Sequence, residues 1–247
     1  NASLIRHGTL ALEYGPDFEL IESGEFERSA DILEEVYLRR VKEIGMDNVI
    51  LLSPYRTKTA TGVNALNARL RDKLNPPSPS KPELTYGKRI FRQGDKVMQT
   101  RNDSRAKAYP DGAGMNYVAN GEIGVVVGRA SKSPTFANVE FSSQVGATYG
   151  YRPSSSDDPP LELAWAVTVH KSQGSEFGVT FLVLPARVAV SRELLYTALT
   201  RQTRKVIILH EGTVDQLFEL ASPALSETAR RMTDLFRKPA PRELTVG

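Results

Sequence analysis

The chain has 247 residues, of which 40% are hydrophobic and 25% charged, as in an ordinary globular protein with one large domain or two small ones. The absence of cysteine excludes disulfides, thiolate metal sites and cysteine catalysis, and it indicates a reducing, cytoplasmic location. No apolar run reaches the roughly 20 residues of a membrane span, so we expect no membrane partner, and the net charge of +3 mildly favours an anionic one.

The first part of the chain alternates strands and helices. Residues 18–22 read as a strand, and Ser29 is expected to cap a helix of 3.6-residue period that stops at Gly45. Residues 48–52 are continuously apolar, as in a parallel strand buried on both faces. A second helix has one apolar face, made of Val63, Leu66, Leu70 and Leu74. This alternation predicts an α/β layer.

A proline-rich linker at residues 75–83 breaks the alternation, and the apolar period then changes to two. Three candidate strands follow, at residues 95–100, 122–127 and 136–141. Asn120-Gly121 is the expected hairpin turn, because both residues tolerate positive φ. The pattern predicts a small inserted β-barrel that a second linker, residues 152–160, closes off.

The α/β pattern then resumes. Strands are expected at residues 179–184 and 206–209, with a short helix between them capped by Ser191, and one or two helices follow from about Val214. The predicted units are an α/β domain in two parts, an insertion and a tail: residues 1–85, 86–155, 156–212 and 213–247. Because the sequence opens at Asn1 inside a polar and apolar pattern, we expect a fragment of a longer protein.

The sequence offers no complete nucleotide site. The nearest candidate for a phosphate-binding loop, Gly128–Ser133, is too short and has Ser131 where glycine is required. No apolar strand ends in an acidic pair that would hold Mg²⁺. Residues 170–177, HKSQGSEF, are rich in polar chemistry, but no second histidine or cysteine completes a catalytic set. By itself this chain is predicted not to hydrolyse ATP.

Three segments in this order resemble motifs IV, V and VI of superfamily 1 helicases: residues 51–57, 168–177 and 195–201. The HKSQGSEF form is similar to the RecD-like branch, which includes the exodeoxyribonuclease V alpha subunit and TraA-type conjugative helicases. Residues 94–103 and 120–126 look like the barrel insertion of that branch, and residues 1–8 resemble the segment after motif III. The resemblance extends to about Gly212.

The resemblance implies a second RecA-like domain, without a P-loop, that carries an inserted SH3-like β-barrel. ATP and Mg²⁺ are then expected between this chain and an N-terminal RecA-like domain of the same polypeptide. The full protein is expected to move along single-stranded DNA in the 5′ to 3′ direction, in repair, recombination or conjugation, and possible further partners are subunits of a nuclease or conjugation complex. The fragment alone is expected to be inactive.

Two arginines are the catalytic candidates that the resemblance supplies. Arg201 matches the arginine finger of motif VI, and a guanidinium suits that role because it is always charged and presents several donors. Arg56 matches the arginine of motif IV, which also approaches the γ-phosphate. Glu176 matches the acid that bonds the nucleotide sugar, and Gly174 and Ser175 complete the nucleotide-binding set.

Motif V also supplies candidates for the DNA strand. Thr168, His170 and Lys171 carry groups that bond phosphate oxygens without reading sequence, and Gln173 is expected to couple the DNA side to the nucleotide side. For Trp165 and Tyr196, base stacking competes with core packing, and packing is favoured for Trp165. A further set in the barrel faces either DNA or solvent, namely Lys96, Arg101 and Asn102.

Two other functions fit the same residues. The chain is alternatively a non-catalytic helicase-like module that binds DNA or a protein partner, in which case the first half of the parent lacks a working P-loop. A second alternative is an RNA-directed superfamily 1 helicase. The inserted barrel is either a DNA-contacting element or a protein-docking one.

Overall fold

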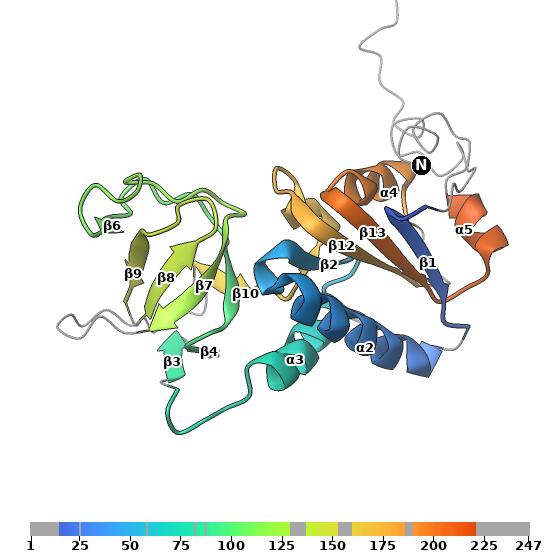
Figure 1. The fold of residues 1–247 in the computed structure, drawn as a ribbon, viewed down its shortest axis with the longest axis horizontal. Coiled ribbons are helices and arrows are strands. Elements are labelled where there is room, and N and C mark those ends of the chain that lie inside the picture. Colours follow the sequence, from blue (N-terminus) through green and yellow to red (C-terminus); the bar gives the residue numbers. More distant parts are fainter. Residues whose placement is uncertain are drawn as a thin grey trace, which may run out of the picture.

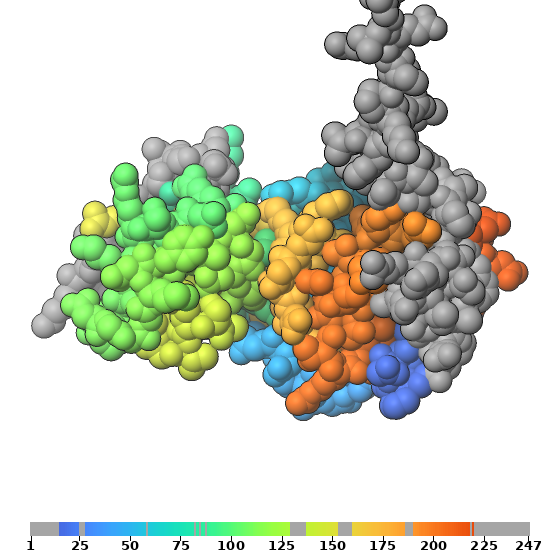
Figure 2. All heavy atoms as spheres, turned by 90° about the horizontal axis from the view of Figure 1, so that it is seen from above, coloured from blue at the N-terminus to red at the C-terminus, as the bar shows by residue number. Residues whose placement is uncertain are grey.

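The computed structural model describes residues 15–24, 26–57, 59–81, 83–86, 88–128, 137–152, 160–185 and 190–220. Two lobes lie side by side in this part of the chain (Figure 1). The α/β lobe contains a parallel sheet and its helices, and the β lobe contains the strands between residues 83 and 163. In the space-filling view the two lobes touch along a seam (Figure 2). No helix of the described residues has the length and apolar character that crossing a membrane requires.

The α/β lobe is built on a five-stranded sheet in the order β1-β13-β12-β2-β11. Its strands are β1 (Phe18–Glu22), β2 (Val49–Ser53), β11 (Ala166–Thr168), β12 (Phe177–Leu184) and β13 (Gln202–His210). Every neighbouring pair is parallel, with registers such as Ser53 opposite Thr168 and Phe177 opposite Gln202. The predicted parallel α/β sheet is confirmed.

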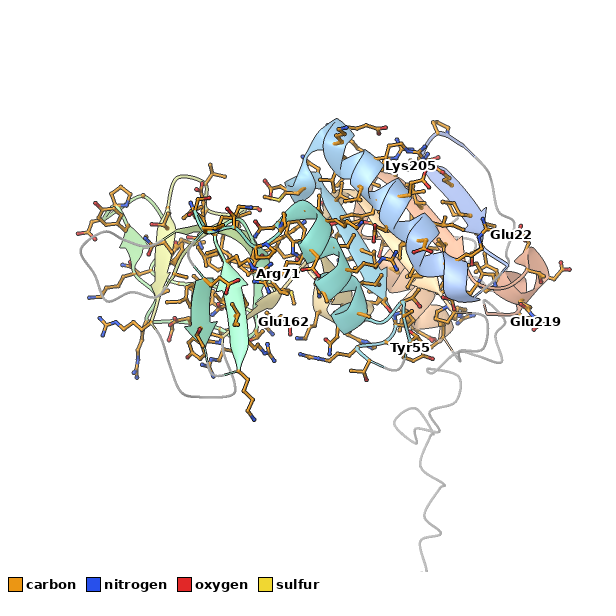
Figure 3. The ribbon with its side chains drawn as sticks, turned by 90° about the horizontal axis from the view of Figure 1, so that it is seen from below. Glu22, Tyr55, Arg71, Glu162, Lys205 and Glu219 are labelled. Atoms are coloured by element: carbon orange, nitrogen blue, oxygen red, sulfur yellow. The ribbon has the colours of Figure 1, made fainter. Side chains whose placement is uncertain are left out.

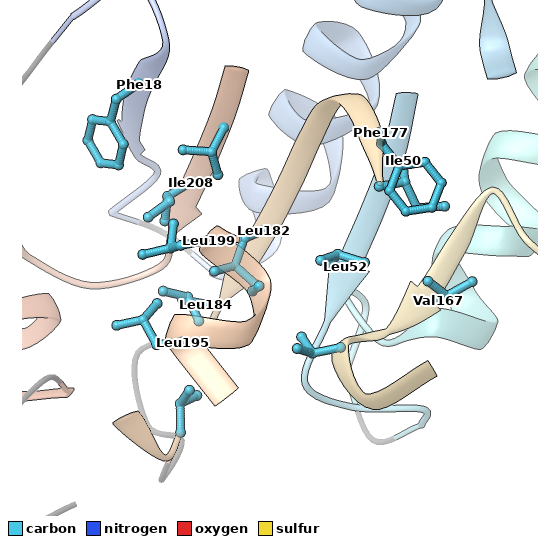
Figure 4. Close-up of a cluster of buried hydrophobic side chains, with 14 of the residues drawn as sticks. Phe18, Ile50, Leu52, Val167, Phe177, Leu182, Leu184, Leu195, Leu199 and Ile208 are labelled. Carbon is cyan, nitrogen blue, oxygen red and sulfur yellow. The ribbon is translucent and has the colours of Figure 1, made fainter. Parts of the chain in front are cut away.

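Helices cover both faces of this sheet, which explains why its strands are continuously apolar. Along β2, Val49 and Leu51 pack under α2 (Phe26–Ile44) and α3 (Val63–Leu74). Ile50 and Leu52 point to the opposite face, in the cluster that includes α4 (Arg192–Leu199) and α5 (Val214–Leu220) (Figure 4). Successive side chains of a strand point to opposite faces, so a run without alternation fills two cores.

The helix ends follow the predicted signals in two of three places. Ser191 caps α4, with its Oγ accepting from the Leu194 N–H at 3.2 Å. Gly45 follows the end of α2 with a φ of 83°, a conformation in which glycine bears no Cβ penalty. The prediction of Ser29 as the cap of α2 is wrong: the helix begins at Phe26, and the buried Ser29 hydroxyl shares a 2.6 Å hydrogen bond with Ser23.

The β lobe is a six-stranded antiparallel sheet in the order β10-β5-β7-β8-β9-β6, accompanied by a separate hairpin. Its strands are β5 (Lys96–Gln99), β6 (Ala108–Tyr109), β7 (Ile123–Gly128), β8 (Ala137–Phe141), β9 (Thr148–Tyr151) and β10 (Leu161–Leu163), and the hairpin is β3 (Glu83–Tyr86) with β4 (Arg89–Arg92). The three strands predicted from the two-residue period are β5, β7 and β8. The lobe has its own core, which includes Phe91, Val126 and Phe141.

Two details of the β lobe differ from the prediction. Gly121 does lie in a turn, with a φ of 90° and the Glu122 N–H donating to the Ala119 carbonyl at 3.3 Å, but that turn leads from an isolated bridge at Val118 rather than joining two paired strands. The antiparallel sheet also continues past residue 155, since β10 pairs with β5. Leu161 fills the core of the β lobe, and this burial holds β10 there.

Some predicted segments fall outside the described residues. They are the N-terminal stretch 1–8, the candidate loop beyond Gly128, most of the second linker and the tail after residue 220.

Lys96 joins the two lobes. It is fully buried on β5, and its Nζ donates to the carbonyl oxygens of Met46 at 2.7 Å and Val49 at 2.8 Å, both in the α/β lobe. The same Nζ lies 6.0 Å from the centroid of the Phe177 ring. Burial lowers the pKa of Lys96 to about 8, because removal from water disfavours the ammonium form. The expectation that Lys96 faces DNA or solvent is therefore wrong.

The lowered pKa of Lys96 predicts a pH-dependent stability. From about pH 8 to its ordinary pKa of 10.5, the unfolded lysine binds more protons than the folded one, so the free energy of unfolding rises with pH. The wild type should gain up to about 1.4 kcal/mol per pH unit relative to Lys96→Met between pH 8 and 9.5. Denaturant unfolding of both proteins checks this, and a difference that does not vary with pH would contradict it.

Candidate nucleotide and nucleic-acid interface

The octapeptide segment, residues 169–176, is the connection between β11 and β12. These parallel strands lie on the two sides of β2, so the chain must return from the carboxyl end of β11 to the amino end of β12. It does so through a short 3₁₀ helix, η2 (Val169–Ser172), which packs against α4. Thr168 and Glu176 therefore lie at opposite ends of the sheet.

Two buried residues hold the octapeptide segment against the sheet. Val169 and Ser172 are almost fully buried, and Ser172 Oγ donates to the Val169 carbonyl at 2.8 Å. His170, Gln173 and Glu176 are exposed. The segment thus presents three of the predicted site residues outward from one fixed backbone.

Gly174 gives the segment its bend. Its φ is 88°, a conformation that other residues rarely adopt. The next residue, Ser175, donates its N–H to the Ser172 carbonyl at 3.1 Å and so closes a turn.

At the amino end of the sheet, Arg201 ties α4 to the octapeptide segment. Its Nε donates to the Thr197 carbonyl at 3.1 Å, its Nη1 to the Ser175 carbonyl at 3.4 Å and its Nη2 to Thr200 Oγ1 at 3.1 Å. In return, the Phe177 N–H donates to the Arg201 carbonyl at 2.9 Å. The structure thus brings Arg201 to the predicted nucleotide-binding residues at 174–176.

At the carboxyl end, one carboxylate holds two predicted cations. Glu162, on β10, accepts from Arg56 Nη2 at 3.2 Å and from Lys171 Nζ at 2.5 Å. Thr168 ends β11 directly opposite Ser53, the last residue of β2, and Arg56 follows in the next loop. Arg56 is thereby grouped with Thr168 and Lys171, which are candidates for the DNA strand. Glu162 is not recognisable from the sequence, because a lone acid in a short strand carries no functional pattern.

The structure does not bring the two predicted catalytic arginines together. Arg56 follows the carboxyl end of β2, whereas Arg201 precedes the amino end of β13. The five residues of β2 separate these ends of the sheet by roughly 15 Å. The sequence already indicates this separation, because Arg56 comes after an apolar strand and Arg201 comes before one, and parallel strands place these positions at opposite ends of the sheet.

A cavity lies at each end of the seam between the lobes. The cavity at the carboxyl end has a volume of about 350 Å³ and is lined by Arg56, Arg71, Arg89 and Glu162 among others. Figure 3 labels two of these residues, Arg71 of α3 and Glu162 of β10 in the β lobe. The cavity at the amino end, of about 410 Å³, lies between the turn at residues 119–123 and residues 173–177.

Of the remaining predicted contacts, Trp165 is core packing, whereas Arg101 and Asn102 lie at the surface of the β lobe. Trp165 is only 1% exposed and belongs to the core under α2 and α3, so the packing interpretation is confirmed. Tyr196 is partly buried against the core on the α4 side. Asn102 accepts from the Asn120 N–H at 2.8 Å, and Arg101 is exposed. Within the described residues, no group of acidic or histidine side chains is placed to hold a metal ion.

Two family models match the chain. The model of the ATP-dependent RecD-like DNA helicase SH3 domain matches residues 66–141, which include most of α3 and of the β lobe. The model of the UvrD-like helicase C-terminal domain matches residues 163–209, which include the octapeptide segment and Arg201. Both matched models are helicase domains, so the chain is similar to the C-terminal region of RecD-like helicases of superfamily 1.

Individual curated proteins are also similar to this chain. An uncharacterized protein of Methanocaldococcus jannaschii is 27% identical over 240 residues, covering 88% of this chain and 20% of that protein. The ATP-dependent RecD2 DNA helicase of Deinococcus radiodurans is 33% identical over 164 residues, covering 65% of this chain and 20% of that protein. The chain therefore spans about a fifth of the length of these curated relatives.

The fold of the chain is also similar to that of a solved helicase structure. In the Bacteroides Pif1 helicase in complex with ADP-AlF3 and ssDNA, the matching region is 21% identical with a TM-score of 0.51. The match covers 87% of this chain and 49% of that one. At this level of identity the likeness shows the shared fold.

Asn67 fixes the chain where it passes from the β lobe back into the parallel sheet. Its Nδ2 donates to the carbonyls of Leu163 at 3.3 Å and Ala166 at 2.8 Å, and its Oδ1 accepts from the Ala166 N–H at 2.9 Å. It is a buried polar residue on the otherwise apolar face of α3. These bonds set the start of β11 and hence the position of Thr168.

Replacing Asn67 with alanine should destabilise the protein by about 2 to 3 kcal/mol, because backbone groups of Leu163 and Ala166 lose buried partners. Asn64→Ala, on an exposed position of the same helix, should change stability by less than about 0.5 kcal/mol. Denaturant unfolding measures both. Equal losses would show that the Asn67 bonds contribute nothing specific.

Proposed function

We propose that this chain is the second motor domain of an ATP-dependent DNA helicase. The octapeptide segment carries the proposal. This one short connection begins at the carboxyl end of the sheet, beside the candidate DNA-binding residues, and ends at the amino end, where it contacts Arg201. An N-terminal RecA-like domain of the same polypeptide supplies the P-loop and the Mg²⁺ ligands. The name of the Deinococcus relative, an ATP-dependent DNA helicase, supports this assignment.

The amino end of the sheet is the proposed nucleotide side. Arg201 acts as the arginine finger, since a guanidinium spreads its positive charge over several donors that match a phosphoryl group. In this structure its nitrogens donate to groups of its own lobe, so engaging a γ-phosphate requires the side chain to leave Thr197 and Ser175. Glu176 is exposed nearby and is assigned to the nucleotide sugar.

The carboxyl end is the proposed DNA side. Thr168, His170 and Lys171 bond phosphate oxygens of a single strand, as hydroxyl, imidazole and ammonium groups do without reading sequence. We place Arg56 in this group rather than beside Arg201, because it shares the Glu162 carboxylate with Lys171. Movement is assigned 5′ to 3′, in the cytoplasm, with nuclease or conjugation subunits as candidate partners.

The octapeptide segment also provides the proposed coupling between the two sides. The Ser175 carbonyl accepts a hydrogen bond from Arg201, and Lys171 lies only four residues earlier in the same segment. When Arg201 turns toward a phosphate, that hydrogen bond is lost and the segment is free to adjust. Gln173, exposed in the middle of the segment, is assigned to this coupling.

Arg201→Ala in the full-length protein should lower DNA-stimulated ATP turnover by roughly 10³-fold while ATP still binds. Arg204→Ala, an exposed arginine in β13, is the matched control and should leave turnover unchanged. Steady-state ATP hydrolysis with and without single-stranded DNA measures both.

Three results discriminate the alternatives, two from ATP hydrolysis and one from competition between single-stranded DNA and RNA. If Arg201→Ala leaves ATP turnover unchanged, Arg201 is not the arginine finger. A wild type without DNA-stimulated hydrolysis removes the motor function and favours the non-catalytic binding module. Stronger competition by single-stranded RNA than by DNA favours the RNA-directed class.

Gly174→Ala and Gly146→Ala are a matched pair of substitutions. Both glycines have positive φ, 88° and 84°, and neither has an atom within 4 Å of an added Cβ, so each variant should lose about 1 kcal/mol of stability. Only Gly174 lies in the octapeptide segment, so only its variant should lower DNA-stimulated turnover, by roughly tenfold or more. Unfolding and hydrolysis assays test this, and equal turnover in the two variants would refute the coupling role.

A further inference from the structure

Glu162 occupies the place between two cations where an external anion would bind. Its side chain is only 12% exposed, yet its two oxygens reach Arg56 and Lys171, whose side chains are 48% and 34% exposed. A carboxylate that bridges a guanidinium and an ammonium meets the same demands as a phosphodiester, which also offers two anionic oxygens to such donors. The charges of Arg56 and Lys171 are thus partly neutralised by a carboxylate of the same chain.

The anion and the cations come from different lobes. Glu162 belongs to β10 of the β lobe, whereas Arg56, in the loop after β2, and Lys171, in η2, belong to the α/β lobe. Ion pairs this close to solvent are each worth about 0.2 to 1 kcal/mol, so a polyanion is able to displace them. The β lobe therefore supplies the α/β lobe with a negative charge that a polyanion can displace.

Glu162 also has an alternative to these partners. It lines the carboxyl-end cavity of about 350 Å³ together with Arg71 and Arg89. Arg71 is committed to the buried Asp95, with 2.7 Å between Arg71 Nη2 and Asp95 Oδ2. Arg89 makes one long bond of 3.4 Å to the Leu161 carbonyl, which leaves it donors to spare. A displaced carboxylate thus has both space and a second cation beside it.

We propose that Glu162 is an internal competitor for a nucleic-acid phosphate, which must displace this carboxylate to bind Arg56 and Lys171. The inference rests on the proposed function, because it assumes that these two cations contact the DNA strand. The inserted β lobe then controls the affinity for DNA. The Glu162 carboxylate weakens the binding of each phosphate and pairs again with Arg56 and Lys171 when the phosphate leaves. Glu162 acts through its neighbours and is a positioning residue.

Glu162→Gln tests the inference in the full-length protein, because the amide keeps the shape and removes the charge. Fluorescence anisotropy with a labelled single-stranded oligonucleotide, over a series of NaCl concentrations, should show roughly three- to tenfold tighter binding than the wild type at about 0.1 M salt. Glu83→Gln, which removes a carboxylate paired with Arg92 at 2.7 Å in the same lobe, should leave the affinity unchanged. Partial unfolding would weaken DNA binding, so a gain in affinity distinguishes loss of the carboxylate from damage to the fold.

A double-mutant comparison locates the effect. In an Arg56→Ala, Lys171→Ala background, Glu162→Gln should no longer raise the affinity. ATP affinity without DNA should be the same in Glu162→Gln and wild type, because Glu162 lies at the end of the sheet away from Arg201. A change in ATP affinity would assign the displaced carboxylate to the nucleotide instead and overturn the inference.

The remaining outcomes separate the two proposals. Unchanged or weaker DNA binding by Glu162→Gln, with normal binding by the wild type, overturns the competitor role and leaves the helicase proposal intact. A wild type that does not bind single-stranded DNA overturns both. Glu162→Ser, a smaller neutral residue, is the second variant and should give the same gain should Glu162→Gln unfold.

Discussion

The arrangement of the site depends on one constraint of chain connectivity. β11 and β12 are parallel and lie on the two sides of β2, so the chain has to recross the sheet between them. It does this with the octapeptide segment instead of a long helix, and the polar residues of that segment are therefore spread along the whole length of the sheet. Thr168 and Glu176 are close in sequence but belong to opposite ends, and the site has two sides for this reason.

The β lobe is fastened next to this crossover by buried polar contacts. Lys96 reaches from β5 to two carbonyls of the α/β lobe, close to the Phe177 ring at the start of β12. Asn67 fixes the chain at the other end, where β10 leads into β11. Buried lysine and asparagine side chains are costly unless they are paired, so these contacts favour one placement of the lobes over others.

Charge at the carboxyl end follows from that placement. With the β lobe held against α3, Glu162 lies between Arg56 and Lys171 and neutralises part of the charge that a DNA strand would seek. Arg201, at the other end, is occupied by carbonyls of its own lobe. Arg56, Lys171 and Arg201 therefore already have partners within the chain, which in the proposed function a phosphate displaces.

The sequence alone determined the kinds of elements and much of their order. Apolar runs such as residues 179–184 indicate strands buried on both faces, the change to a two-residue period marks the insertion, and Ser191 and Gly45 mark helix ends through local chemistry. The tertiary structure decided which residues meet. Glu162 with Arg56 and Lys96 with Met46 are contacts between positions far apart in the chain, and only lobe packing and strand order, not local pattern, bring them together.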